Sequence, residues 1–158
     1  MANHEQQNKE EGSAKVSVVV ICRAAEEDAV IGSIGLTQAF VEAGQGATIV
    51  FAGEALHALG RGTFRWSECF KGRDARTLII RNAEKAGIAA ADRTRDPRWS
   101  DVRALLEGIA SDGTIRLVAC PVWSSLLGQG AEPAYLETIE SSELVALLAA
   151  ADTIVGGY

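Results

Sequence analysis

The chain has three cysteines, and one of them stands where a thiol could do chemistry. Cys120 follows an apolar run over residues 115–119, and Pro121 comes directly after it. Because proline suits the first position of a helix, this order predicts a strand that delivers a thiol to a helix start. Free backbone N–H groups there, with the hydroxyls of Ser124 and Ser125 nearby, would favour the thiolate. Cys120 is therefore our candidate catalytic residue.

A second interpretation treats Cys120 as packing, because cysteine is among the most frequently buried side chains. Cys22 ends a very apolar run, where burial is the favoured interpretation, and Cys69 receives no role. The separations between the three exclude CxxC redox and zinc-ribbon spacings, and three cysteines do not form a disulfide framework. The residues alone leave the reactive and the packing interpretations of Cys120 open.

Other catalytic chemistries find little support in the sequence. There is no GxSxG motif, and the two histidines, His4 and His57, offer neither a convincing base nor a metal site. Neither a GxGxxG nor a Walker-type glycine loop follows the first strand, so we expect no metal and no cofactor. Arginines between residues 61 and 98 alternate with acids, which is typical of a solvated face.

Composition indicates one globular domain and excludes some classes of binding partner. The 158 residues are 47% hydrophobic, enough to bury a core without disulfides. A net charge of -6 argues against general binding to nucleic acid or to an anionic membrane. No apolar run is long enough for a membrane helix, and residues 1–14 lack the apolar segment of a signal peptide. We expect a cytoplasmic protein with a disordered tail at 1–14 and a single domain at 15–158.

Hydrophobic periodicity predicts alternating strands and helices. The predicted strands are 15–22, 46–52, 114–120 and 152–158, and the predicted helices are 26–43, 54–60, 101–111 and 142–151. Residues 61–98 fit either a strand at 77–80 or a helix at 74–85, and 125–141 reads as a long connection with a short helix. This alternation predicts an α/β fold, a three-layer α/β/α sandwich with a mostly parallel sheet of four or five strands.

Two details of the helices carry further expectations. The first helix is apolar over more than one stripe, so we expect part of it to face a second subunit. We expect Gly32 and Gly35 within it to permit close approach of the helix to the sheet or to that partner. For the last helix we expect Ser141 or Ser142 to act as the N-cap.

Four features occur together along the chain. The first is a helix that ends Phe-Val-Glu-Ala-Gly at residues 40–44, and the second is the strand Ala-Thr-Ile-Val-Phe-Ala-Gly at 47–53. The third is the strand Ile-Arg-Leu-Val-Ala-Cys at 115–120, which Leu-Leu-Gly follows at 126–128. The fourth is the ending Leu-Leu-Ala-Ala-Ala-Asp-Thr-Ile-Val at 147–155. Together they resemble the DsrE/DsrF-like superfamily, in particular its DsrE-like, peroxiredoxin-like branch. The resemblance spans residues 15–158 and is poor over 60–99.

This resemblance implies a homo-oligomer, a homotrimer or hexamer, and a role for Cys120 as a persulfide carrier in a sulfur relay. A sulfurtransferase-like activity with a donor or acceptor protein would follow, whereas the absence of a Thr-x-x-Cys motif argues against a peroxidase. We assign substrate binding to the neighbours of Cys120 and to the end of the first strand, namely Pro121, Trp123, Ser124, Ser125 and Arg23. The alternative is a non-catalytic, oligomeric module that binds a small ligand, with Cys120 as core packing.

Overall fold

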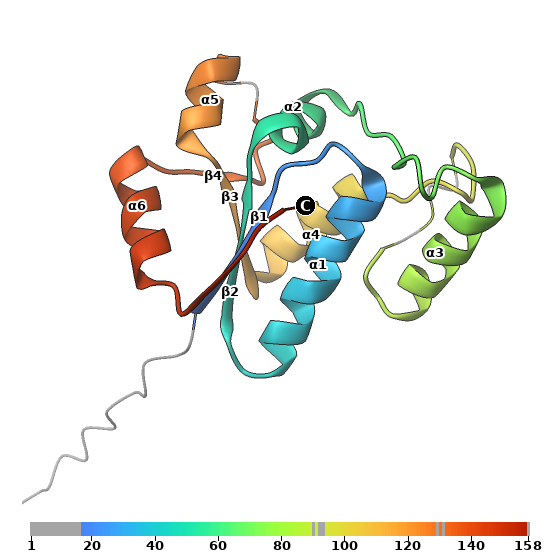
Figure 1. The fold of residues 1–158 in the computed structure, drawn as a ribbon, viewed down its shortest axis with the longest axis horizontal. Helices are drawn as coiled ribbons and strands as arrows, with labels where there is room; N and C mark the ends of the chain where they lie inside the picture. Colours follow the sequence, from blue (N-terminus) through green and yellow to red (C-terminus); the bar gives the residue numbers. More distant parts are fainter. Residues whose placement is uncertain (1–16, 90, 92–93, 129, 131, 158) are drawn as a thin grey trace, which may run out of the picture.

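The structure is a computed structural model that describes residues 17–89, 91, 94–128, 130 and 132–157. The predicted tail at 1–14 and the first two residues of the first predicted strand lie outside these residues. Figure 1 shows how the elements are arranged. The strands are β1 (Ser17–Cys22), β2 (Gly46–Phe51), β3 (Ile115–Ala119), β4 (Glu137–Thr138) and β5 (Thr153–Val155). The helices are α1 (Glu27–Glu42), α2 (Gly53–Arg61), α3 (Arg73–Lys85), α4 (Val102–Asp112), α5 (Pro121–Leu127) and α6 (Ser141–Ala150).

The five described strands form one parallel sheet in the order β4-β3-β2-β1-β5. Helices cover both of its faces, so the predicted three-layer α/β/α sandwich is confirmed (Figure 1). The register places Cys22 opposite Phe51, and Phe51 opposite Ala119. The carboxyl ends of β1, β2 and β3 therefore lie level at one edge, where ligands usually bind in such sheets.

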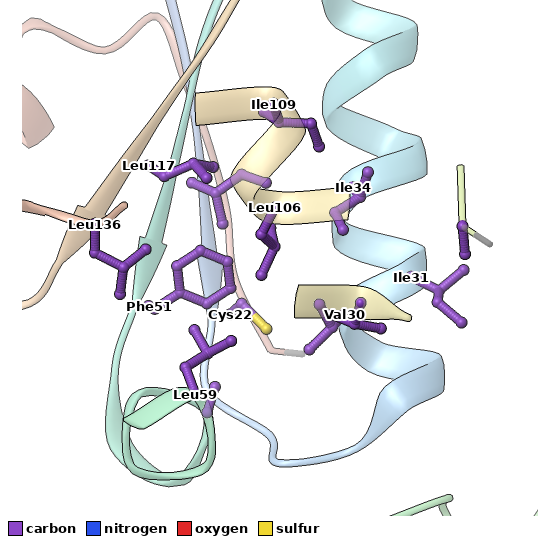
Figure 2. Close-up of a cluster of buried hydrophobic side chains, with 14 of the residues drawn as sticks. Cys22, Val30, Ile31, Ile34, Phe51, Leu59, Leu106, Ile109, Leu117 and Leu136 are labelled. Carbon is purple, nitrogen blue, oxygen red and sulfur yellow. The ribbon is translucent and has the colours of Figure 1, made fainter. Parts of the chain in front are cut away.

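One face of the sheet carries the larger core. Side chains of β1, β2 and β3 meet α1 and α4 there, and Phe51, Ile34 and Leu106 have no exposed surface. Figure 2 shows these side chains converging, with the sulfur of Cys22 among them. The β-branched run of β1 is buried on both sides, as a central parallel strand requires.

The opposite face has a thinner cover. Val19, Val50 and Val118 are buried beneath α5 and α6, yet none of the ten residues of α6 is fully buried. Val145 of α6 keeps 66% of its surface exposed, although seven of the ten residues of this helix are apolar. Within the described part of the chain, no helix combines the length and apolarity that a membrane span requires.

Residues 61–98, for which the sequence allowed a strand or a helix, contain helix α3. Its Ile80 and Ala83 join the core cluster to which α1 belongs. Nearby, a Cβ placed on Gly35 would lie 3.1 Å from the Cδ1 atom of Ile88. Apolar surface of α1 that we expected to face a second subunit is thus covered in part by this excursion. Within one copy of the chain, the close approach at Gly35 is to Ile88 and not to the sheet, and Gly32 has open space around it.

The predicted N-cap of the last helix is wrong by one or two residues. Glu140 is the N-cap of α6, and it forms a capping box with Glu143, whose Oε2 accepts the Glu140 amide at 2.9 Å. A carboxylate can serve in place of a serine hydroxyl because both accept hydrogen bonds from backbone N–H groups and the negative charge suits the helix start.

The two mid-helix glycines of α1 give a matched stability test. We expect Gly32→Ala to raise the free energy of unfolding by about 0.5–1 kcal/mol, because alanine lowers the entropy lost on folding. Gly35→Ala should gain less or destabilise, because its methyl group displaces Ile88. Urea unfolding of both variants measures the difference, and a larger gain at Gly35 would contradict the packing described here.

Candidate functional site at the carboxyl end of β3

Cys120 lies directly after β3 and forms the N-cap of α5. Its amide donates to the carbonyl oxygen of Phe51 at 2.9 Å, and its own carbonyl accepts the amide of Ser124 at 2.9 Å. Pro121 occupies the first turn of α5, so the helix start predicted there is confirmed. Backbone hydrogen bonds on both sides therefore fix the position of Cys120 at the edge of the sheet.

The thiol of Cys120 points to the face covered by α5 and α6. It is 8% exposed and belongs to the apolar cluster with Val50, Val118 and Ile139. Among the described residues, no hydrogen bond joins its sulfur to the first amides of α5. Apolar packing therefore holds the side chain, without a capping hydrogen bond from the helix start.

A cavity of about 450 Å³ opens beside Cys120. Ala119 and Pro121, the residues on either side of the cysteine, both line it. Other parts of its wall come from α5, from the chain around β4 and from the start of α6: Ser124, Ser125, Gly130, Glu132, Thr138, Ile139, Glu140, Ser141 and Glu143. The cavity thus lies where the carboxyl end of β3 meets β4 and α6.

Carboxylates give this cavity an acidic character. Glu132, Glu140 and Glu143 all line it, and the pKa of Glu132 is lowered, first by the nearby hydroxyl of Ser124 and then by backbone amides. Ser124 is 7% exposed, and no described atom is placed to complete a well-formed hydrogen bond with its buried Oγ. The negative charge should disfavour small anionic ligands and favour neutral or cationic ones.

The predicted substrate-binding residues fall in three places. Pro121, Ser124 and Ser125 share the cavity beside Cys120. Trp123 is half-buried and lies over α2, where its ring atoms are 3.9 Å from a Cβ placed on Gly53. Gly53 has φ +56°, a left-handed conformation that suits glycine. Arg23 is exposed at the end of β1, two strands away from β3, and its carbonyl accepts the Ala55 amide at 2.9 Å.

The acidic residues of the cavity could not be identified from the sequence. Glu132 lies in a stretch that we interpreted only as a connection, and Glu140 and Glu143 follow at the start of the last helix. No local motif marks them, because a wall is formed only when β4 pairs with β3 over two residues. The sequence indicated no role for His57 as a catalytic base or metal ligand. In the structure it lies with Ser124 and Glu132 around a small space of about 30 Å³ between α2 and α5.

Comparison with known proteins supports the architecture. No protein-family model matches the chain, and no curated protein sequence matches it. The solved structure of the ychN protein from E. coli superposes with a TM-score of 0.50 at 13% identity, covering 92% of this chain and 100% of that one. The chain has a DsrE-like fold.

In this DsrE-like fold, Cys22 and Cys120 lie on opposite faces of the sheet. Cys22 belongs to the core beneath α1 and α4 (Figure 2), whereas Cys120 belongs to the cluster beneath α5 and α6. Strand β2 also separates their strands. The two thiols are therefore not placed to form a disulfide, and Cys69 is exposed in a separate loop.

Burial sets the chemistry of Cys22. It has no exposed surface, and desolvation raises its pKa to about 11, an effect that hydrogen bonds with Ser33 and Ala24 only partly offset. Since the thiolate is the nucleophile, a thiol with this pKa stays protonated and unreactive near neutral pH.

Alkylation rates will separate the three cysteines. With iodoacetamide at about pH 8, we expect Cys69 to react first, Cys120 more slowly and Cys22 only on unfolding. Peptide mass spectrometry over time measures the three rates, and the same reaction in urea is the control in which all three should react alike. Labelling of Cys22 as fast as Cys69 in the folded protein would contradict its burial.

Proposed function

We propose that this chain is a sulfur-relay protein that carries sulfane sulfur as a persulfide on Cys120. The observation that supports this function most strongly is the position of the thiol at the carboxyl end of β3, between two residues that line a cavity of about 450 Å³. Chemistry in parallel α/β sheets collects at this edge. The DsrE-like fold and the resemblance in the sequence support the same role.

The relay consists of two exchange reactions. The Cys120 thiol first loses its proton to solvent, and the thiolate attacks the terminal sulfur of a donor persulfide. A new S–S bond forms at Cys120 as the donor S–S bond breaks, and the donor leaves as a thiolate. An acceptor thiolate then attacks the terminal sulfur on Cys120, takes it, and releases the Cys120 thiolate. No net oxidation occurs, because one S–S bond replaces another in each step.

The charge around the cavity favours a particular kind of donor. Glu132, Glu140 and Glu143 repel small sulfur anions such as thiosulfate and polysulfide. A persulfide presented by a cysteine on a partner protein with a neutral or basic surface would meet no such repulsion. A donor or acceptor protein is therefore the favoured partner.

A second candidate function follows from the burial of Cys120. Its 8% exposure and its apolar neighbours suit a packing residue, so the chain would then be a non-catalytic module that binds a small ligand in the same cavity. The two functions differ in whether Cys120 takes up sulfur.

Persulfide mapping tests the relay directly. We expect treatment with a small persulfide donor to add one sulfur atom to Cys120, with slow uptake because of its burial and the acidic cavity. Peptide mass spectrometry after trapping of free persulfides locates the adduct. Because Cys69 is exposed and can also take up sulfur, the comparison is made in a Cys69→Ser background, which should retain uptake at Cys120, whereas the further substitution Cys120→Ser should abolish it. Absence of uptake at Cys120 in the Cys69→Ser variant, or equal uptake in the double variant, would refute the relay and favour the binding module.

We also propose that the chain forms a homotrimer or hexamer through α6. Apolar side chains on this side of the molecule remain exposed, and they extend from α6 to α5 and β5: Val145 at 66%, Leu126 at 69%, Val122 at 52% and Ile154 at 49%. Exposed apolar side chains that gather on one side of a molecule typically mark an interface between proteins. Among the described strands, β5 pairs only with β1, so its outer edge offers backbone groups for pairing with another chain.

Charge substitutions test the oligomer. We expect Val145→Glu to lower the mass of the particle to that of a monomer, because a carboxylate would be buried in the interface. Leu78→Glu is the matched control, since Leu78 is also an exposed apolar residue, at 56%, and lies on α3, away from α6 (Figure 1). Sedimentation velocity measures both. A monomeric parent protein, or the same dissociation in both variants, would contradict the proposal.

A further inference from the structure

Positive charge is concentrated in one excursion of the chain. Residues 61–98 contain ten of the fifteen Lys and Arg residues but only five of the twenty-one Asp and Glu residues. This segment therefore has a net charge of +5, and the rest of the chain has -11. Helix α3 lies within it, on the opposite side of the molecule from α5 and α6 (Figure 1). The protein is acidic overall, but this side of it is basic.

A cleft of about 580 Å³ lies within this basic region, between α3 and the loop at 96–98. Arg73, Thr77 and Arg81 follow one another at four-residue intervals, so they line one face of α3. Arg98 lines the cleft from the loop, and Leu78 and Pro97 form the apolar part of its wall. The volume falls within the range of about 300–1,000 Å³ that is typical of small-molecule sites.

Two of these arginines have charge available for a ligand. Within the part of the chain that the structure describes, neither Arg73 nor Arg81 forms an ion pair. Two carboxylates also line the cleft, Asp74 and Asp96. Asp96 is already engaged, because it pairs with Arg98, which lowers the pKa of Asp96 through hydrogen bonds.

A further arginine of α3, Arg76, acts on Asp96, one of the residues that line the cleft. The guanidinium of Arg76 stands 5.4 Å from the centre of the Trp99 ring, and that of Arg95 stands 4.8 Å from it. The Nε atom of Arg76 is buried, and no described atom accepts its hydrogen. Among the described residues, this leaves a buried donor whose hydrogen bond is not made, which is energetically costly. Arg76 is also close enough to Asp96 to lower its pKa.

We propose that this cleft binds a small organic oxyanion, through a phosphate or carboxylate group held by Arg73 and Arg81. Guanidinium groups recognise both kinds of oxyanion through paired N–H donors, and they bind them more strongly than neutral donors do. An apolar part of the ligand would lie against Leu78 and Pro97. This site is separate from Cys120, so its failure would leave the sulfur-relay proposal unaffected.

Nuclear magnetic resonance titration of the full, ¹⁵N-labelled chain tests the site. Inorganic pyrophosphate and citrate are the probes for the phosphate and carboxylate classes. We expect saturable shifts in the amides of residues 73–81 and 96–98 and in the indole N–H of Trp99, with affinity that falls as salt is added. The tighter of the two probes identifies the class of oxyanion.

A charge-matched pair of variants decides whether the cleft is specific. The double variant Arg73→Gln, Arg81→Gln should weaken binding at least about tenfold, because each substitution removes charge-assisted hydrogen bonds to the oxyanion. Arg61→Gln with Arg103→Gln removes the same charge from α2 and α4 outside the cleft, and it should leave affinity within about twofold. Equal weakening in both pairs, or no saturable shift with either probe, would overturn the proposal. Unchanged spectra of both variants away from the substitutions would confirm that they fold.

Discussion

Burial of the parallel sheet on both faces is the constraint on which the rest of this structure depends. The valines of β1 keep at most 1% of their surface exposed, and each such side chain contributes about 1.5–3 kcal/mol when buried. Helices α1 and α4 cover one face of the sheet, and α3 packs against the same core. The other has only the seven residues of α5 and the ten of α6. This unequal cover explains why Cys22 lies in a closed core, whereas Cys120 lies beside a cavity and α6 stays exposed.

Local patterns were enough to predict most of the fold. The β-branched run of β1, the periodicity of α4 and the proline after Cys120 each depend on neighbours in the sequence, and all three elements appear where predicted. The segment at 61–98 was ambiguous because Leu78 to Ile80 suit a strand as well as a helix. Packing of Ile80 and Ala83 into the core of α1 decides for the helix, and that contact is not visible in a local window.

For the candidate site, too, only the features that depend on neighbouring residues in the sequence could be predicted. Cys120 and Pro121 belong to one local motif, but the cavity beside them depends on where β4 docks. That strand has two residues and pairs only with β3 among the described strands. Arg116 of β3 holds it with two hydrogen bonds of 2.6 Å to the carboxylate of Glu137. A partly exposed pair of this kind contributes about 1 kcal/mol at most, so the cavity wall is one of the more weakly held parts of the sheet.

The distribution of charge and apolar surface is compatible with both proposed sites in one assembly. If copies of the chain meet through α6, the basic cleft on α3 lies on the far side of each copy and remains open to ligand (Figure 1). The acidic cavity, by contrast, includes Glu140 and Glu143 at the start of α6, so it would lie at the border of that interface. Carboxylates from neighbouring copies would then repel one another unless a basic surface lay between them. A basic partner protein would relieve this repulsion, and it is also the kind of donor that the acidic cavity beside Cys120 favours.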